Sequence, residues 1–432
     1  MILDKGLTFF KGRSDGSPLQ DSQKKELSFI SCIYYILFAF FYSFHFAKTT
    51  MFFKECFAEY SDMLYQIYDK ATAVLLVLSI VTILFCSNKI SSKVLMIAIL
   101  VISYMYNFYR GVTVYKTITV FLLLIVCSQN KSLKTICRLF LIIGWGWVIA
   151  SFIACKAGIL TDITLGDRHS FGSIYCTDLA CHLLTLVMAH CILRNGKLKI
   201  YEYGMIVLLM GFNVLYLKAK VGLICMFLIL VVTAFNQYIA PHTEGKNKKN
   251  SMLKWICIAS FSLLTVITVF LTLIYTKDSS FLLNRIPGFG TFTSRFYMGR
   301  VAFDQYDINL WGNNIPENGN GGKIGGTPVD YFFLDISYTR ILLTTGAVIF
   351  ALLLLIFTAL QIRLHKHNRL YLMAIVAIFL LDCAVEHHML ELAYDFFPLM
   401  LFCNLNTFEQ CSNICMEKKR SIRDFFAVKS TA

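Results

Sequence analysis

The run KWICIASFSLLTVITVFLTLIYT, residues 254–276, has no charged side chain after its first residue. An apolar stretch of about 20 residues makes a helix long enough to cross the hydrocarbon core of a bilayer. Comparable blocks recur along the whole chain of 432 residues. The sequence therefore predicts an all-α fold, a polytopic bundle of membrane-spanning helices.

Measured against that spanning length, the apolar blocks predict about 12 transmembrane helices. They lie near residues 27–47, 68–87, 93–109, 111–127, 136–157, 174–193, 199–217, 220–239, 254–276, 336–361, 370–388 and 393–410. The last block contains Asp395 and Pro398 and has the weakest pattern. We expect residues 1–432 to form a single integral membrane domain.

Composition and charge agree with a membrane protein. Apolar residues make up 57% of the chain and charged residues only 15%. The formal net charge of +14 could indicate a nucleic-acid partner, but excess Lys and Arg in a membrane protein mark loops that face the cytoplasm. No nucleic-acid partner is therefore expected. The 15 cysteines lie mostly in apolar segments, without the spacing of a disulfide framework or a metal site.

Basic residues in the connections predict the orientation of the helices. They gather at the N-terminus, in every second connection and in the C-terminal tail. These are Lys5, Lys11, Arg13, Lys24, Lys25, Lys89, Lys93, Lys131, Lys134, Arg138, Arg194, Lys197, Lys199, Lys246, Lys248, Lys249, Lys254, Arg363, Lys366, Arg369, Lys418, Lys419, Arg420, Arg423 and Lys429. Both termini are then cytoplasmic, which requires an even number of spans.

The same alternation places one long loop, residues 277–335, outside the cytoplasm. Long connections of this kind are usually functional or disordered. Its segment SRFYMGRVAFDQY, residues 294–306, predicts an amphipathic helix, and residues 312–328 form a flexible tract rich in Gly and Asn.

Several basic residues fall on the outer side, against the charge rule. They are Arg110, Arg168, Lys218, Lys220, Arg285, Arg295, Arg300 and Arg340. The planar guanidinium group binds two oxygens of a phosphate or diphosphate in fixed geometry, so the set favours an anionic ligand. Tyr297, Tyr306 and Trp311 could stack on sugar rings, although aromatic residues at a membrane boundary are more often interface anchors.

Ionisable residues also lie inside the predicted spans, where they are costly and indicate function. Asp178 and His182 are one helical turn apart, and Asp382 and Glu386 have the same spacing, followed by His387 and His388. We expect them to line an outward polar cavity. No nucleotide-binding or metalloprotease motif accompanies them. We therefore expect no cofactor and no metal, with arginine supplying the countercharge to any leaving phosphate.

Three stretches resemble the O-antigen and capsular polysaccharide polymerases of bacteria, the Wzy type. They are GDRHSFG (residues 166–172), TSRFYMGRVAFDQYDINLWGNN (293–314) and LDISYTRILLTTG (334–346). Two positions depart from the family pattern. Tyr175, Cys176 and Thr177 stand where the family often has His-Pro-Asn, and Ala219 and Lys220 stand where many members have Ser-Arg.

The resemblance implies a metal-independent glycosyl transfer at the outer leaflet of the bacterial cytoplasmic (inner) membrane. A polymer linked through pyrophosphate to undecaprenol is the donor, and one lipid-linked repeat unit is the acceptor. Arg168 and Arg295 then stabilise the departing pyrophosphate, with Lys220, Arg300 and Arg340 as helpers. His169 or Glu386 is the candidate base, and Asp335 and Tyr338 orient the loop or the sugar.

Other readings stay open. A lipid-linked oligosaccharide flippase has a similar substrate, but such transporters usually pair two similar halves, and no such similarity is visible here. An O-antigen ligase shares the layout and differs in its acceptor. A receptor or channel leaves the outward arginines unexplained. Expected partners are undecaprenyl-pyrophosphate-linked oligosaccharide, membrane lipid, and the chain-length regulator and flippase of the same pathway.

Overall fold

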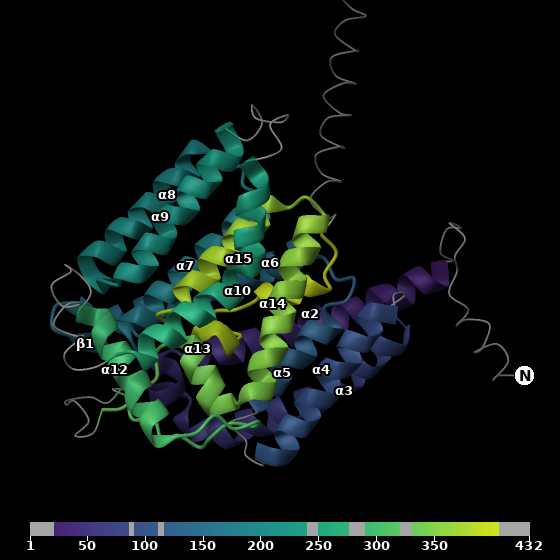
Figure 1. Ribbon diagram of the computed structural model, residues 1–432, viewed down its shortest axis with the longest axis horizontal. Coiled ribbons are helices and arrows are strands. Elements are labelled where there is room, and N and C mark those ends of the chain that lie inside the picture. The colour runs from purple at the N-terminus through teal and green to yellow at the C-terminus, as the bar shows by residue number, and fades with distance from the viewer. Residues whose placement is uncertain are drawn as a thin grey trace, which may run out of the picture.

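A computed structural model of the chain describes residues 21–85, 90–110, 116–239, 249–275, 290–319 and 331–405 (Figure 1). Helices dominate it, with one two-stranded hairpin, β1 (Thr164–Leu165) and β2 (Arg168–His169). The α-helices are α2 (Asp21–Lys48), α3 (Ser61–Phe85), α4 (Ile90–Arg110), α5 (Lys116–Cys127), α6 (Leu133–Lys156), α7 (Cys176–Leu193), α8 (Ile200–Phe212), α9 (Lys220–Ala234), α10 (Lys249–Leu273), α12 (Gly290–Gln305), α13 (Ser337–Arg340), α14 (Ala347–Lys366) and α15 (Leu370–Asp382). The short π and 3-10 helices are η1 (Phe52–Cys56), η2 (Ala58–Tyr60), η4 (Asn213–Leu217), η5 (Phe235–Ile239), η7 (Ile341–Thr345), η8 (His388–Leu390) and η9 (Phe397–Leu401).

Within the described residues, nine helices are long and apolar enough to cross a membrane. They are Phe29–Lys48, Ala58–Phe85, Ile90–Arg110, Leu133–Lys156, Cys176–Leu193, Ile200–Leu217, Lys220–Tyr238, Met252–Leu273 and Ala347–Lys366. The chain is thus a multi-pass membrane protein, as the apolar blocks predict. The count of about 12 is not reached by this criterion, because α5 and α15 are shorter than a full span.

The two shorter helices are largely buried within the bundle. In α5, every residue from Ile118 to Cys127 is buried, and α15 packs against α9 and α10. Helices surrounded by protein need not match the bilayer thickness, because their ends meet other backbone rather than lipid headgroups.

The predicted twelfth helix, residues 393–410, is wrong over its described part. Residues 393–405 form turns and the short helix η9, and almost all of them are buried. The chain returns here without α-helix to the end of the bundle where α15 begins. Asn130 N donates to Phe402 O, Asn404 N donates to Lys131 O, and Arg363 of α14 donates to the carbonyls of residues 400, 401 and 403. Irregular backbone is tolerated at this depth because protein, not lipid, surrounds it.

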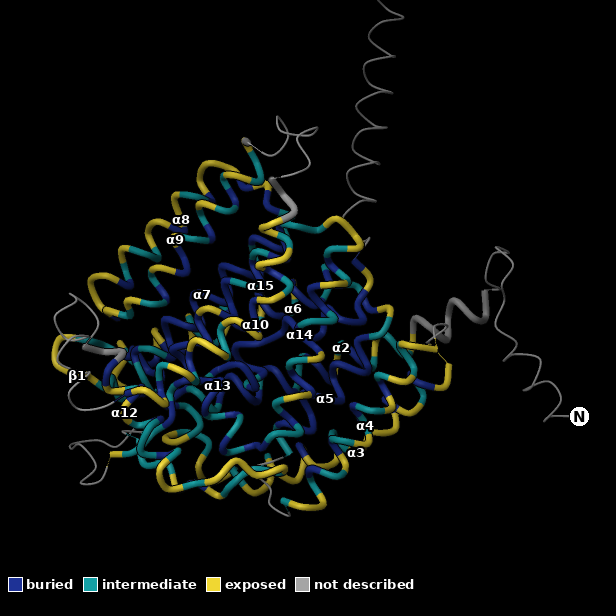
Figure 2. Tube along the Cα trace, viewed as in Figure 1, coloured by how far each residue is buried: buried dark blue, intermediate teal, exposed yellow. Residues whose placement is uncertain are grey.

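The centre of the bundle is α7, which packs against α6 and α9. Figure 2 shows the buried residues concentrated around α7, α15, α14 and α2, with exposed residues on the outer turns of α8, α9, α3 and α4. The α8 and α9 pair lies on one side of the bundle and the α3 and α4 pair on the other (Figure 1). These outward apolar faces are the surfaces that a bilayer would cover.

The long loop is partly ordered against the bundle. Residues 276–289 and 320–330, which include Arg285, lie outside the described residues. The predicted helix is confirmed as α12, which packs on α10. Residues 306–319 cross the end of α4, where Arg110 donates to Gly312 O and Asn313 O at 2.9 and 3.0 Å. Farther along the loop, Asn318 pairs with Phe332 in an isolated antiparallel bridge.

Candidate functional site

A cleft of about 390 Å³ opens where α2, α7, the long loop and the segment after α15 meet. Its lining residues come from five stretches that are far apart in sequence. They are Lys48, Thr49, Lys54, Ile174, Tyr175, Asp178, Glu317, Asn318, Gly319, Phe333, His387, Glu391 and Tyr394. The cleft carries both lysines and carboxylates, so it can hold an anion and move a proton. Of the ionisable residues expected to line an outward polar cavity, Asp178 and His387 line this cleft, whereas His182, Asp382, Glu386 and His388 do not. The side of the membrane that the cleft faces stays a prediction.

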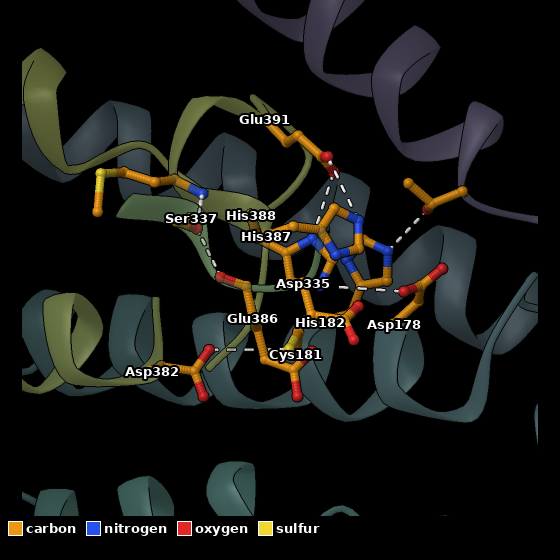
Figure 3. Close-up of polar contacts among 12 residues, drawn as sticks. Asp178, Cys181, His182, Asp335, Ser337, Asp382, Glu386, His387, His388 and Glu391 are labelled. Carbon is orange, nitrogen blue, oxygen red and sulfur yellow. Dashed lines mark hydrogen bonds and ion pairs between the residues drawn. The ribbon is translucent and has the colours of Figure 1, made fainter. Parts of the chain in front are cut away.

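One wall of the cleft is built from the segment of turns and the short 3-10 helix η8 that follows α15. Glu391 faces two adjacent rings, with His387 Nε2 at 3.5 Å and His388 Nδ1 at 3.3 Å (Figure 3). His388 Nε2 points toward Asp178 Oδ1 of α7 at 3.9 Å.

His182 fixes the position of that wall relative to α2. Its ring is stacked between Phe46 and Tyr394, with centroid distances of 3.9 and 4.1 Å. Thr49 Oγ1 lies 2.8 Å from His182 Nε2. His182 is therefore a packed, hydrogen-bonded residue behind the cleft rather than a residue that lines it.

Arg295 is held between two carboxylates. Its Nε lies 3.3 Å from Asp335 Oδ2, and its Nη2 lies 3.0 Å from Glu386 Oε1. The Arg295 side chain is 10% exposed and does not line the cleft. Burial raises the pKa of Asp335 to about 6, against the opposing effect of Arg295. Burial alone would lower the pKa of Arg295, but Glu386 and Asp335 outweigh it and raise that pKa.

Arg340, like Arg295, does not line the cleft, but it contacts two residues that do. Its Nη2 lies 2.7 Å from Glu317 Oε2, and its guanidinium carbon lies 4.8 Å from the ring centroid of Phe333. Its Nη1 is buried and has no hydrogen-bond partner among the described residues. A buried guanidinium N–H without a partner is costly, which favours an additional acceptor such as a ligand oxygen. Burial raises the pKa of Glu317, and Arg340 opposes this.

The other residues that the sequence singled out lie away from the cleft. Arg168 and His169 form β2, where Arg168 Nε donates to Leu217 O and His169 Nδ1 lies 2.7 Å from Asp162 Oδ2. Lys220 is exposed at the start of α9, and Arg300 pairs with Asp304 on α12. Tyr338 is buried and donates its hydroxyl to Leu380 O.

The structure therefore brings together only part of the predicted set. Arg295, Asp335 and Glu386 form one ion-paired group, and Arg340 joins the cleft through Glu317. The sequence analysis missed Lys48, Lys54, Glu317 and Glu391 as lining residues. The only sequence signal for Glu391 is the run EHHMLE, in which two histidines lie between acidic residues. In the sequence, Lys48 and Lys54 are typical of basic residues near a helix end. Only the fold places them in one cleft with α7.

Comparison with known proteins does not place the chain in a family. No protein-family model, no curated protein and no solved structure matches it. The functional argument therefore rests on the chemistry of the cleft.

Proposed function

We propose that the protein is a polysaccharide polymerase that joins lipid-linked oligosaccharide repeat units at the outer leaflet of the bacterial cytoplasmic membrane. The donor is a growing polymer on undecaprenyl pyrophosphate, and the acceptor is a single repeat unit on the same lipid. The observation that carries the proposal is the mixed-charge cleft at one end of a membrane helix bundle. A substrate with a lipid tail, a diphosphate and a sugar chain needs an apolar surface, positive charge and polar side chains in one place.

The cations of the cleft suit the diphosphate. Lys48 and Lys54 line it, and Arg340 offers an unpartnered Nη1 beside Glu317 and Phe333. Positive groups placed where charge develops on the leaving diphosphate lower the barrier to its departure. Arg340 is therefore the proposed main contact of the departing diphosphate, a role that the sequence predicted for Arg295 and Arg168.

Glu317 is the proton acceptor in this proposal. It lines the cleft, whereas His169 and Glu386 do not, and burial raises its pKa toward the range in which a general base works well. An acceptor hydroxyl oxygen forms a bond to the anomeric carbon of the donor as its proton passes to the Glu317 carboxylate. The bond between that carbon and the diphosphate oxygen breaks, and the electron pair leaves with the lipid diphosphate.

Arg295, Asp335 and Glu386 act as positioning residues behind this reaction. The ion-paired group ties α12 of the long loop to the segment that carries His387 and Glu391. Tyr338 of α13 donates to Leu380 O of α15, the helix that precedes this segment. Arg168, Lys220 and Arg300 lie at the bundle surface, where they can contact the sugar chain or the headgroups of membrane lipid. The chain-length regulator and flippase of the pathway are the proposed protein partners.

Cell-surface polysaccharide provides the test. Cells that lack the native copy receive Arg340→Ala, Lys54→Ala or Glu317→Gln, and the surface polysaccharide is separated on a gel. We expect single repeat units in place of the ladder. Lys218→Ala is the matched control, because Lys218 pairs with Asp167 away from the cleft, and it should keep the full ladder.

The same gel separates the alternatives. Loss of a flippase leaves no repeat units exported, and loss of a ligase leaves full-length polymer on its lipid. A normal ladder in all three cleft variants would contradict the proposed site, and either of the other two patterns would contradict a polymerase.

A further inference from the structure

Three buried polar atoms converge beside the cleft without hydrogen-bond partners. They are Asp178 Oδ1, His387 Nδ1 and His388 Nε2, and none has a partner among the described residues. Asp178 is 6% exposed and His388 is 2% exposed. One ligand atom from each of these three residues can be chosen so that all lie within 4.8 Å of one another. Leaving three such atoms unsatisfied costs free energy, which a common partner would recover.

The second nitrogen of each ring is held by the same carboxylate. Glu391 Oε1 lies 3.5 Å from His387 Nε2, and Glu391 Oε2 lies 3.3 Å from His388 Nδ1 (Figure 3). A histidine that binds a metal typically donates its other ring N–H to a carboxylate, which fixes the ring orientation and the tautomer. Here one glutamate contacts a ring nitrogen of both histidines. Tyr394 holds the His388 ring from the other side, at a centroid distance of 3.8 Å.

We propose that Asp178, His387 and His388 bind a divalent transition-metal ion, with Zn²⁺ the preferred species. The donor set is two imidazoles and one carboxylate, which suits zinc and its neighbours in the first transition row. Two ligand atoms about 2.1 Å from a tetrahedral ion lie roughly 3.4 Å apart. The 3.9 Å between His388 Nε2 and Asp178 Oδ1 closes to that value with a small side-chain movement.

An alternative group shares His388 but is already occupied. Cys181, Glu386 and His388 also bring ligand atoms within 4.8 Å of one another. However, Cys181 Sγ contacts Asp382 Oδ2 at 3.7 Å, and Glu386 Oε1 pairs with Arg295 at 3.0 Å. The ligand atoms of the Asp178 group have no such partners, so that group is the site.

Three protein ligands leave a coordination position open, as in catalytic rather than structural zinc sites. Asp178 and His387 line the cleft, so the open position is accessible from it. An ion there would add positive charge to the wall that faces Lys54 and Glu317. The proposal that this ion acts on a diphosphate rests on the proposed function. The proposal that the chain binds a metal ion does not.

Metal binding to the full-length chain in detergent is the direct test. The purified protein is stripped with a chelator, dialysed, and titrated with Zn²⁺ by calorimetry and with Co²⁺ by visible absorption. We expect one ion per chain and the intense absorption of Co²⁺ in a low-symmetry site with few ligands. Asp178→Asn and His388→Ala should abolish binding, and Glu391→Gln should weaken it by about 10- to 100-fold.

His190→Ala is the matched control. His190 lies at the other end of α7 and also faces a carboxylate, with its Nε2 3.1 Å from Glu202 Oε1. Binding should be unchanged in this variant. Should a site variant fail to fold, electron paramagnetic resonance of Cu²⁺ in the unmodified chain decides, because two coordinated imidazoles give nitrogen couplings.

Absence of Zn²⁺ and Co²⁺ binding to the stripped chain would overturn the proposal, as would equal binding in His388→Ala and His190→Ala. The cell-surface assay separates this outcome from failure of the proposed function. If the chain binds the metal but makes no polymer, the metal site stands and the polymerase function is contradicted. If the chain makes polymer but binds no metal, the polymerase function stands and the metal site is contradicted.

Discussion

Arg295 of the long loop forms buried ion pairs with Asp335 and Glu386. Replacing it by Ala leaves Asp335 and Glu386 without their partner, and an uncompensated buried charge costs about 3–5 kcal/mol. Arg295→Lys keeps the charge but lacks the planar fork that contacts both carboxylates. We expect the thermal unfolding midpoint in detergent to fall most in Arg295→Ala and less in Arg295→Lys.

Arg300→Ala serves as the control for that measurement. Arg300 makes a more exposed ion pair with Asp304, and such pairs contribute less than about 1 kcal/mol. Equal midpoints for Arg295→Ala and Arg300→Ala would show that the buried group does not hold the loop.

The raised pKa of Asp335 predicts that the stability of the fold depends on pH. Its pKa is raised from 3.8 to about 6, so the folded chain holds more protons than the unfolded chain between those values. Stability from this group is present at low pH and is lost as pH rises through about 6, by up to about 3 kcal/mol. Asp335→Asn does not titrate. The midpoint of Asp335→Asn relative to the unmodified chain should therefore increase from pH 4 to pH 7, and a constant difference would contradict the assignment.

At the scale of elements, the contact between the long loop and the start of α14 depends on two glycines. Gly346 has φ of +93° and Gly312 has φ of +80°, a region that side chains rarely adopt. A Cβ on Gly346 would also collide with the backbone of Gly312 and Leu310. Gly346→Ala thus adds strain of about 1–3 kcal/mol to a backbone clash.

We expect Gly346→Ala to lower the unfolding midpoint and to open residues 306–319 to proteolysis. Gly204→Ala on α8 is the control, because a Cβ there meets nothing within 4 Å. In a helix that change should be neutral or stabilising by about 0.5–1 kcal/mol. Unchanged protease sensitivity in Gly346→Ala would argue against the anchoring role of this contact.

Elements differ in how far the sequence could predict them. Apolar length predicts a helix at every expected block but the last, because lipid-facing helices need about 20 apolar residues. It fails over the described residues 393–405 of that block, since burial in protein also requires apolar residues but imposes no helix. Pro398 and Asp395 were the only local signs of the break, with Asp395 Oδ1 accepting from Phe397 N.

The sequence predicts only those residues of the site that depart from the usual charge pattern of membrane proteins. Asp178, Arg295, Arg340 and Glu386 are charged where membrane patterns disfavour charge, and the fold does bring them near one another in two groups. Glu317 lies in the long loop and Lys54 in the connection between the first two predicted spans. Their place in the cleft follows from contacts between distant segments, which no pattern within one segment contains.

At the scale of the whole molecule, segments that the charge pattern assigns to the same side of the membrane are in contact. Ile174 N donates to Thr49 O between two connections that the charge pattern predicts to be outer, and Asn404 N donates to Lys131 O at the other end of the bundle. Reporter fusions test which end faces the cytoplasm. Fusions at Lys131 and Lys197 should make green fluorescent protein fluoresce, and fusions at Arg168 and Leu310 should activate alkaline phosphatase. The reverse pattern would place the cleft on the wrong side for an outer-leaflet substrate.

The central claim is that the cleft makes glycosidic bonds between lipid-linked repeat units. The most direct measurement reconstitutes the purified chain in vesicles with undecaprenyl-pyrophosphate-linked oligosaccharide and follows both polymer length and released undecaprenyl pyrophosphate. We predict a ladder of polymer and one lipid diphosphate released for each bond, with both lost in Glu317→Gln. Transfer of intact repeat units across the vesicle membrane without any longer product would contradict the account.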